Sequence, residues 1–229
     1  AKLLAETPIA SSLSEAVRPL VYLLEGVDAD DLEAVIDEKR TEWRSLLYTE
    51  DGGFRLPLDY RLDFAVAIHL YTLADPPVFG VVNKAMFNPT RRTPTSAGIS
   101  PELLACMPYI KFLDAALDAL PAAYVFSGEV FRGVRWVYPC PERHDPKSHF
   151  VTGATVMWYE FKSTSREREV MSRPHFGGVA AGPRTVFTVQ STRGYNIEKF
   201  SYFQGVESEF EVLFRPLSQF RVVHSARNI

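Results

Sequence analysis

The sequence is poor in cysteine and contains no long apolar run, and both absences narrow the kinds of protein that it can encode. Its 229 residues include two cysteines, Cys106 and Cys140, which are too few for a disulfide framework. No run of about 18 apolar residues is present, so we expect no membrane-spanning segment. The first residues do not predict a signal peptide, although a processed chain would look the same. The cellular location therefore stays open.

The sequence also lacks an excess of basic charge. Its formal net charge is -3, which does not favour binding to nucleic acid. Apolar residues make up 46% of the chain and charged residues 23%, as in ordinary soluble globular proteins. The length allows a substantial core. We expect one domain over residues 1–229 that acts as a monomer, with no nucleic acid or membrane as a partner.

A metal site is not indicated either. Cys140, His144 and His149 lie close in the sequence and carry metal-binding groups. A fourth ligand is missing, and the spacing matches no standard zinc pattern. A solvated loop is the alternative reading of this segment, and we expect no metal.

The first half of the chain shows helical patterns. Ser12 precedes Glu15 by three residues, which is typical of a capping box at the start of a helix. Ser100 is followed by Pro101, which suits the first helical position. Pro108 is expected to kink or split the last helix. We expect helices over residues 12–26, 28–47, 59–74 and 100–121.

Beyond about residue 122 the pattern changes to short runs of β-branched and aromatic residues, broken by glycine, proline and serine. A short helix is expected within residues 163–173. The pattern predicts an α+β fold, with an N-terminal helical layer (about 1–121) packed on a C-terminal β-sandwich (about 122–229). Strands are expected over residues 129–137, 154–162, 184–190, 209–215 and 219–224.

The first strand-like segment with an unusual polar residue is EVFRGVR at 129–135. Arg132 stands in an apolar run, where packing alone gives no reason for a guanidinium. Gly133 follows it and would let a ligand approach the backbone closely. A guanidinium is well suited to hold a pyrophosphate. The alternative is an arginine at a strand edge that pairs with a local acid such as Glu129.

The second segment is EFKSTS at 160–165, where an aromatic strand runs into three hydroxyl residues. A Ser-Thr-Ser string is common at turns and helix N-caps. One interpretation is therefore a cap before the following REREV segment. The other is a hydroxyl that orients a second functional group.

The third segment is ESEFEVLF at 207–214. Strand alternation would place Glu209 and Glu211 on one face and Phe210 on the other. Two such carboxylates repel each other unless a cationic or hydrogen-bonding ligand lies between them. An edge strand that carries acids to block aggregation is the alternative.

Taken together with their flanks, these segments resemble the mono-ADP-ribosyltransferases with an Arg–Ser–Glu signature. FSYFQGVESEFEVLFRPLSQFRVV is similar to the vertebrate ecto-enzyme pattern, in which an aromatic-rich loop leads to Glu-x-Glu-Val-Leu. MPYIKFLDAALDALP before VFRGVR, and LDFAVAIHLYT and VFGVVNKA further upstream, are similar to other segments of that family. The resemblance covers about residues 59–224.

This resemblance implies a set of site residues and a substrate, NAD. Arg132 would anchor phosphate and ribose, and Ser163 would orient the nucleotide and the catalytic acid. Glu211 matches the catalytic glutamate, and Glu209 matches the upstream acid of Glu-x-Glu. The remaining nucleotide-binding candidates are Tyr71, Gly133, which would meet the nicotinamide carboxamide, Thr164, and Phe176, which would stack on nicotinamide.

The resemblance also implies a reaction. NAD is cleaved at the nicotinamide–ribose bond, and ADP-ribose passes to an acceptor protein with an exposed arginine, since Glu-x-Glu accompanies arginine acceptors in this family. No metal is required. Two alternatives stay open: an NAD glycohydrolase that uses water as the acceptor, and a silent domain that binds NAD or a partner protein.

Overall fold

The structure of the 229-residue chain is a computed structural model that describes residues 1–50, 52–87, 99–135, 150–173, 182 and 184–225. The chain divides into two compact units. The helical unit consists of Ala1–Val125 and Tyr195–Ser208, and the strand unit of Phe126–Gly194 and Glu209–Ile229. Each is described by itself below, and the single domain over 1–229 stays a prediction.

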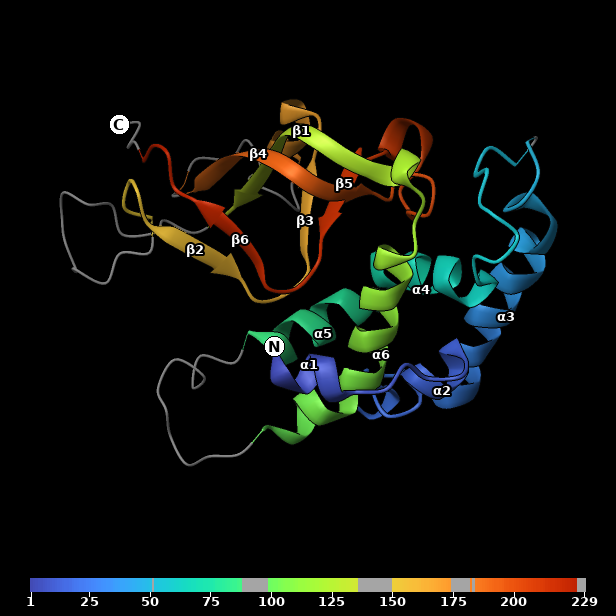
Figure 1. The fold of residues 1–229 in the computed structure, drawn as a ribbon. Coiled ribbons are helices and arrows are strands. Elements are labelled where there is room, and N and C mark those ends of the chain that lie inside the picture. The colour runs from blue at the N-terminus through green and yellow to red at the C-terminus, as the bar shows by residue number, and fades with distance from the viewer. Residues whose placement is uncertain (51, 88–98, 136–149, 174–181, 183, 226–229) are drawn as a thin grey trace. The chain divides into compact units, whose positions relative to one another are not determined.

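Helices form nearly all of the regular structure in the first part of the helical unit (Figure 1). All four predicted helical segments contain a helix, and α5 was not among them. Pro108 lies inside α6, which runs through it without a break. The α-helices are α1 (Lys2–Glu6), α2 (Leu13–Val17), α3 (Ala29–Leu46), α4 (Leu62–Thr72), α5 (Val78–Met86) and α6 (Pro101–Asp118), with 3-10 turns at Val21–Leu23, Ala122–Tyr124 and Gly205–Glu207.

Two of these helices begin at the serines that the sequence indicated. Ser12 is the N-cap of α2 and its hydroxyl accepts a hydrogen bond from the Glu15 amide at 3.2 Å. The Glu15 carboxylate bonds to Ser11 instead of returning to Ser12, so the predicted capping box is half formed. Ser100 caps α6 by accepting from the amide of Leu103 at 3.3 Å. Caps of this kind satisfy amides that have no partner inside the helix.

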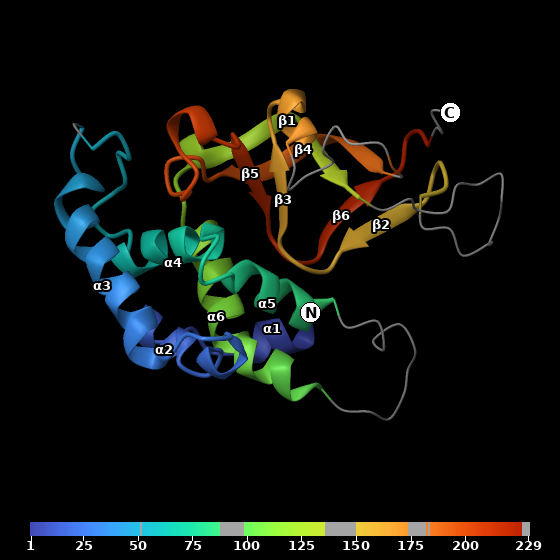
Figure 2. The ribbon, with the colours of Figure 1, turned by 180° about the vertical axis from the view of Figure 1, so that it is seen from behind.

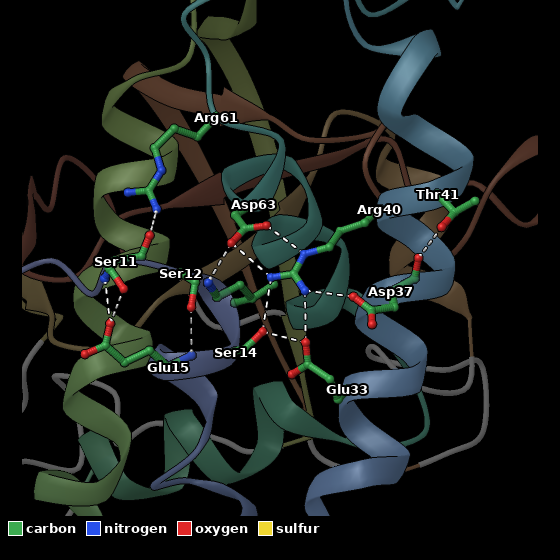
Figure 3. Close-up of polar contacts among 11 residues, drawn as sticks. Ser11, Ser12, Ser14, Glu15, Glu33, Asp37, Arg40, Thr41, Arg61 and Asp63 are labelled. Carbon is green, nitrogen blue, oxygen red and sulfur yellow. Dashed lines mark hydrogen bonds and ion pairs between the residues drawn. The ribbon is translucent and has the colours of Figure 1, made fainter.

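Arg40 ties α2, α3 and α4 together (Figure 3). Its Nε donates to Asp63 Oδ1 at 2.8 Å, and its Nη2 donates to Asp63 Oδ2 at 3.0 Å. Nη1 contacts Glu33 at 2.9 Å and Asp37 at 2.8 Å, and Nη2 also bonds to Ser14 at 3.1 Å. A bidentate guanidinium–carboxylate pair is among the strongest polar contacts in proteins. This cluster fixes the helices that support the buried α4.

The strand unit contains a small closed barrel and a separate two-stranded sheet. Around the barrel the order is β1-β3-β5-β4, while β2 pairs with β6. Figure 2 shows β3 running beside β5, and β2 beside β6. The strands are β1 (Val125–Val134), β2 (Thr155–Trp158), β3 (Lys162–Ser165), β4 (Thr185–Asn196), β5 (Glu211–Phe214) and β6 (Ser218–Arg221).

The α+β content agrees with the prediction, but the predicted β-sandwich is not confirmed. The segment expected as one strand over 154–162 is interrupted at 159–161. As a result β2 pairs antiparallel with β6, whereas β3 pairs antiparallel with β5. The Ser-Thr-Ser string is therefore part of a strand rather than a helix cap. A residue-by-residue pattern cannot distinguish these outcomes, because strand pairing depends on partners far away in the sequence.

The core of the strand unit lies inside the barrel and beneath the two-stranded sheet. Val130, Trp158, Val212 and Phe214 are buried in one cluster, with Phe220 packed against it. Since Val212 and Phe214 belong to β5, this packing anchors the strand that begins at Glu211. Within the described part of the chain, no helix is long and apolar enough to cross a membrane.

Candidate active site

Three neighbouring barrel strands bring the signature residues together. Arg132 lies on β1, Ser163 on β3 and Glu211 at the first position of β5. The sheet order places β3 between β1 and β5 (Figure 1). In the antiparallel ladder Ser163 is opposite Leu213, and Ser165 is opposite Glu211. Residues separated by about thirty to eighty positions in the sequence thus meet on one surface of the strand unit.

Arg132 is held against β3 by the main chain. Its Nη1 donates to the carbonyl oxygen of Ser163 at 2.7 Å, and the arginine is half-buried. The guanidinium also lowers the pKa of Glu211, so these two charged groups act on each other electrostatically. A half-buried guanidinium with a fixed orientation is suited to bind a phosphate.

Glu211 is buried, with 4% of its surface exposed. Burial raises the pKa of its carboxyl group to about 7, since a carboxylate loses its hydration inside the protein. A hydrogen bond from Ser163 and the charge of Arg132 oppose this shift, and the nearby Glu209 adds to it. A carboxyl group that titrates near neutral pH in a polar cluster is a candidate for catalysis.

Glu209 is also buried, at 9% exposure, but it is not part of the strand. The predicted alternation of Glu209, Phe210 and Glu211 along one strand is wrong, because β5 begins only at Glu211. Phe210 between the acids has a φ of 47°, in the left-handed region that side chains rarely adopt. The two glutamates are therefore brought together by a turn of the backbone and not by the pleat of a strand.

The hydroxyl groups that follow Ser163 have structural partners. Thr164 Oγ1 donates to the carbonyl of Val212 at 2.7 Å, and Ser165 Oγ donates to the carbonyl of Glu209 at 2.6 Å. Both residues are fully buried. Nucleotide binding by Thr164 stays a prediction. Ser165 was not among the predicted site residues. Its signal in the sequence was the third place in Ser-Thr-Ser, and the structure places it opposite Glu211 in the ladder.

The structure does not test the other predicted nucleotide contacts. Gly133 is buried in β1 of the strand unit. Tyr71 belongs to α4 of the helical unit, where its hydroxyl accepts from Asn83 Nδ2 at 2.9 Å. Phe176 lies outside the described residues. The nucleotide contacts of Tyr71, Gly133 and Phe176 therefore stay predictions.

The cysteines and histidines give no metal centre in the part of the chain that is described. Cys140, His144 and His149 lie outside it. Among the described residues, no three His, Cys, Asp or Glu side chains gather closely enough to hold a metal ion. Cys106 is buried in α6, and burial raises the pKa of its thiol to about 11, which keeps it protonated and unreactive.

A pocket of about 640 Å³ lies in the helical unit. Its wall includes Trp43, His69 and Tyr202, with Lys39 and Glu42 near them. None of Arg132, Ser163, Glu209 and Glu211 lines this pocket.

Comparison with protein families agrees with the geometry. The family described as NAD:arginine ADP-ribosyltransferase matches residues 13–228, nearly the whole chain. The chain therefore belongs to this family, and the resemblance inferred from the three sequence segments is confirmed. A comparison with curated protein sequences gave no match.

Solved structures show the same fold. The ADP-ribosyltransferase HopU1 of Pseudomonas syringae pv. Tomato DC3000 aligns with a TM-score of 0.61 at 20% identity, over 94% of this chain and 91% of that one. The type III effector XopAI of Xanthomonas axonopodis pv. citri gives 0.62 at 18% identity, over 98% and 80%. The eukaryotic mono-ADP-ribosyltransferase ART2.2 gives 0.59 at 17%, over 94% and 81%. At these identities the likeness establishes the ADP-ribosyltransferase fold.

Proposed function

We propose that this protein cleaves NAD at the nicotinamide–ribose bond and transfers ADP-ribose to an arginine side chain of an acceptor protein. The observation that carries the proposal is the contact of Arg132 and Glu211 with the same residue, Ser163, beside a second buried acid, Glu209. Family membership supports the NAD chemistry. The acceptor is argued from Glu209.

Glu211 faces the charge that develops during bond cleavage. The glycosidic C–N bond breaks, its electron pair leaves on nicotinamide, which departs neutral, and the ribose carbon becomes oxocarbenium-like. An ionised carboxylate about 4 Å from a unit charge at an effective dielectric of about 20 contributes roughly 4 kcal/mol. This corresponds to about three decades in rate. Since the contribution arises in the transition state, losing it lowers turnover more than binding.

Arg132 has a different task. Its guanidinium is held by the Ser163 carbonyl and is suited to pair with the diphosphate of NAD. Such a contact is present before and during the reaction, so it contributes to binding as well as to turnover. Ser163 links the two roles, because its carbonyl holds Arg132 while its side chain favours the ionised form of Glu211.

Glu209 supports an arginine acceptor. A guanidinium has to approach the ribose carbon as nicotinamide leaves, and a second carboxylate near Glu211 can pair with it. A guanidinium nitrogen then bonds to the ribose carbon and gives up a proton to Glu209 and on to solvent. Water in the same place would give free ADP-ribose, which is the glycohydrolase alternative.

The test uses the purified chain with NAD labelled in its adenylate half, and agmatine as a small guanidine acceptor. We expect labelled ADP-ribosyl-agmatine from the unaltered protein, and a loss of about a thousandfold in Glu211→Gln with NAD binding retained. Glu169→Gln, which alters an exposed acid of the same unit, is the matched control and keeps full activity.

Each other outcome identifies an alternative. Free ADP-ribose with no labelled agmatine or protein would indicate a glycohydrolase. NAD-induced thermal stabilisation without either product would indicate a silent binding domain. Full activity in Glu211→Gln would contradict the assignment of the catalytic acid.

A further inference from the structure

The residue between the two site glutamates has an unusual backbone conformation. Phe210 has a φ of 47°, although a large side chain in this region meets steric resistance and glycine or asparagine is the usual occupant. Such a conformation persists only where surrounding contacts fix it, and it is concentrated at functional sites. The contacts that hold Phe210 are therefore of interest.

Three consecutive residues at the end of β3 hold this stretch of backbone. Thr164 Oγ1 donates to the Val212 carbonyl at 2.7 Å, and Ser165 Oγ donates to the Glu209 carbonyl at 2.6 Å. The Arg166 amide donates to the carbonyl of Phe210 at 3.1 Å.

The side chains of Arg166 and Ser165 also hold this stretch of backbone. The guanidinium carbon of Arg166 lies 5.8 Å from the centre of the Phe210 ring, within the range of a cation–π contact. Ser165 is fully buried and its hydroxyl also accepts from the Glu167 amide at 3.0 Å, which fixes the direction of its hydrogen bond. The ladder keeps Ser165 opposite Glu211. Both sides of Phe210 are thus anchored to one strand end.

This arrangement determines where Glu209 points. In a regular strand, Glu209 and Glu211 would project from the same face about 7 Å apart. The left-handed residue ends the alternation and turns the Glu209 carbonyl to Ser165, so the direction of the Glu209 side chain depends on the turn.

We propose that the left-handed turn at Phe210, held by Ser165 and Arg166, is a positioning device that sets Glu209 against Glu211 and thereby directs ADP-ribose to the guanidinium acceptor rather than to water. This inference rests on the proposed function. Ser165, Arg166 and Phe210 act through Glu209. When the turn relaxes, the C–N bond of NAD still breaks, but water more often forms the new bond to the ribose carbon.

The experiment measures transfer to agmatine and release of free ADP-ribose in parallel. We expect Ser165→Ala and Phe210→Val to lower the ratio of transfer to hydrolysis about tenfold, while the rate of NAD hydrolysis changes less than about threefold. Valine resists positive φ, whereas asparagine accepts it, so Phe210→Asn keeps most of the ratio. Ser191→Ala is the matched control, because it removes another buried serine hydroxyl of the barrel that bonds to the Phe126 carbonyl.

An unchanged ratio in both Ser165→Ala and Phe210→Val would overturn the proposal. So would equal losses in Phe210→Asn and Phe210→Val, which would assign the effect to the ring and not to the backbone. If Phe210→Val does not fold, Phe210→Thr replaces it, because the β-branched threonine also resists positive φ, and it is expected to lower the ratio as Ser165→Ala does.

A second readout does not depend on activity. The Glu211 carboxyl is titrated by carbon NMR in the unaltered protein and in Ser165→Ala. Displacement of Glu209 is expected to lower the Glu211 pKa, because Glu209 helps to raise it. An unchanged titration would overturn the positioning device, even if the unaltered protein shows neither transfer nor hydrolysis. Absence of both activities with a lowered pKa would instead overturn the proposed function alone.

Discussion

Ser163 lies close to Glu211 and lowers the pKa of its carboxyl group, and yet burial raises that pKa to about 7. A hydrogen bond to a carboxylate favours its charged form, while loss of hydration disfavours it. Here the loss of hydration has the larger effect. Near neutral pH the site therefore holds a mixture of the protonated and ionised forms of Glu211.

The raised pKa of Glu211 predicts a pH-dependent stability. Between its ordinary value of 4.5 and about 7, the folded protein binds this proton more tightly than the unfolded chain does. Glu211 therefore destabilises the fold increasingly as pH rises through this window. We expect Glu211→Gln to raise the free energy of unfolding at pH 8 by up to about 3 kcal/mol, and hardly at all at pH 4. Urea unfolding at both pH values checks this, and a gain that is equal at both would contradict it.

Glu209→Gln is expected to separate the two possible reactions. The amide keeps the shape of the side chain but cannot pair with a guanidinium cation. NAD hydrolysis should continue, while ADP-ribosylation of agmatine falls about 10- to 100-fold, as expected for a lost charge-assisted contact. Parallel assays with labelled NAD measure both, and Glu169→Gln serves as the control. Retained transfer to agmatine would argue against Glu209 as the acceptor-binding residue.

Arg132→Lys is expected to weaken NAD binding despite keeping the charge. Lysine offers a single ammonium in place of the fork that holds the Ser163 carbonyl and can bind phosphate oxygens. Losing a charge-assisted hydrogen bond costs about 1.5–3 kcal/mol, so the Kd for NAD should rise about 10- to 100-fold. Isothermal titration with NAD measures the change, and the same replacement at the exposed Arg168 is the control. An unaltered Kd would place the phosphates elsewhere.

Arg40→Met should destabilise the helical unit. Removing the guanidinium leaves Asp63 without the partner that bonds both of its oxygens, in a site where 18% of each side chain is exposed. Breaking one side of a buried pair is costly, and for this partly exposed one we expect about 2–3 kcal/mol. Thermal unfolding checks it. Lys2→Ala, which removes an exposed pair with Glu6, should change stability by less than about 0.5 kcal/mol.

Gly194→Ala tests the packing of the barrel. A Cβ at Gly194 would lie 2.4 Å from Cγ1 of Val212, on the strand that carries Glu211. Such overpacking typically costs about 1–3 kcal/mol. Gly80→Ala is the contrasting variant, because a Cβ there meets nothing within 4 Å and alanine favours the helix. Chemical denaturation should show a lower free energy of unfolding for Gly194→Ala and no decrease for Gly80→Ala.

Parts of the fold were predictable because they depend on near neighbours. The N-caps at Ser12 and Ser100 formed as expected, since a hydroxyl and an amide a few residues away suffice. The break between β2 and β3 was missed, because Tyr159 continues the aromatic pattern of a strand while the pairing partner changes. Pro108 does not split α6, and the alternative of a kink stays a prediction.

The sequence alone determined which functional groups are present and in which order, since Arg132, Ser163 and Glu211 could be singled out from their apolar surroundings. Only the tertiary structure decided the closed barrel, the left-handed Phe210 and the burial that raises the pKa of Glu211. Those properties arise from contacts between distant strands, and a local pattern of residues carries no information about distance, desolvation or a hydrogen bond from a neighbouring strand.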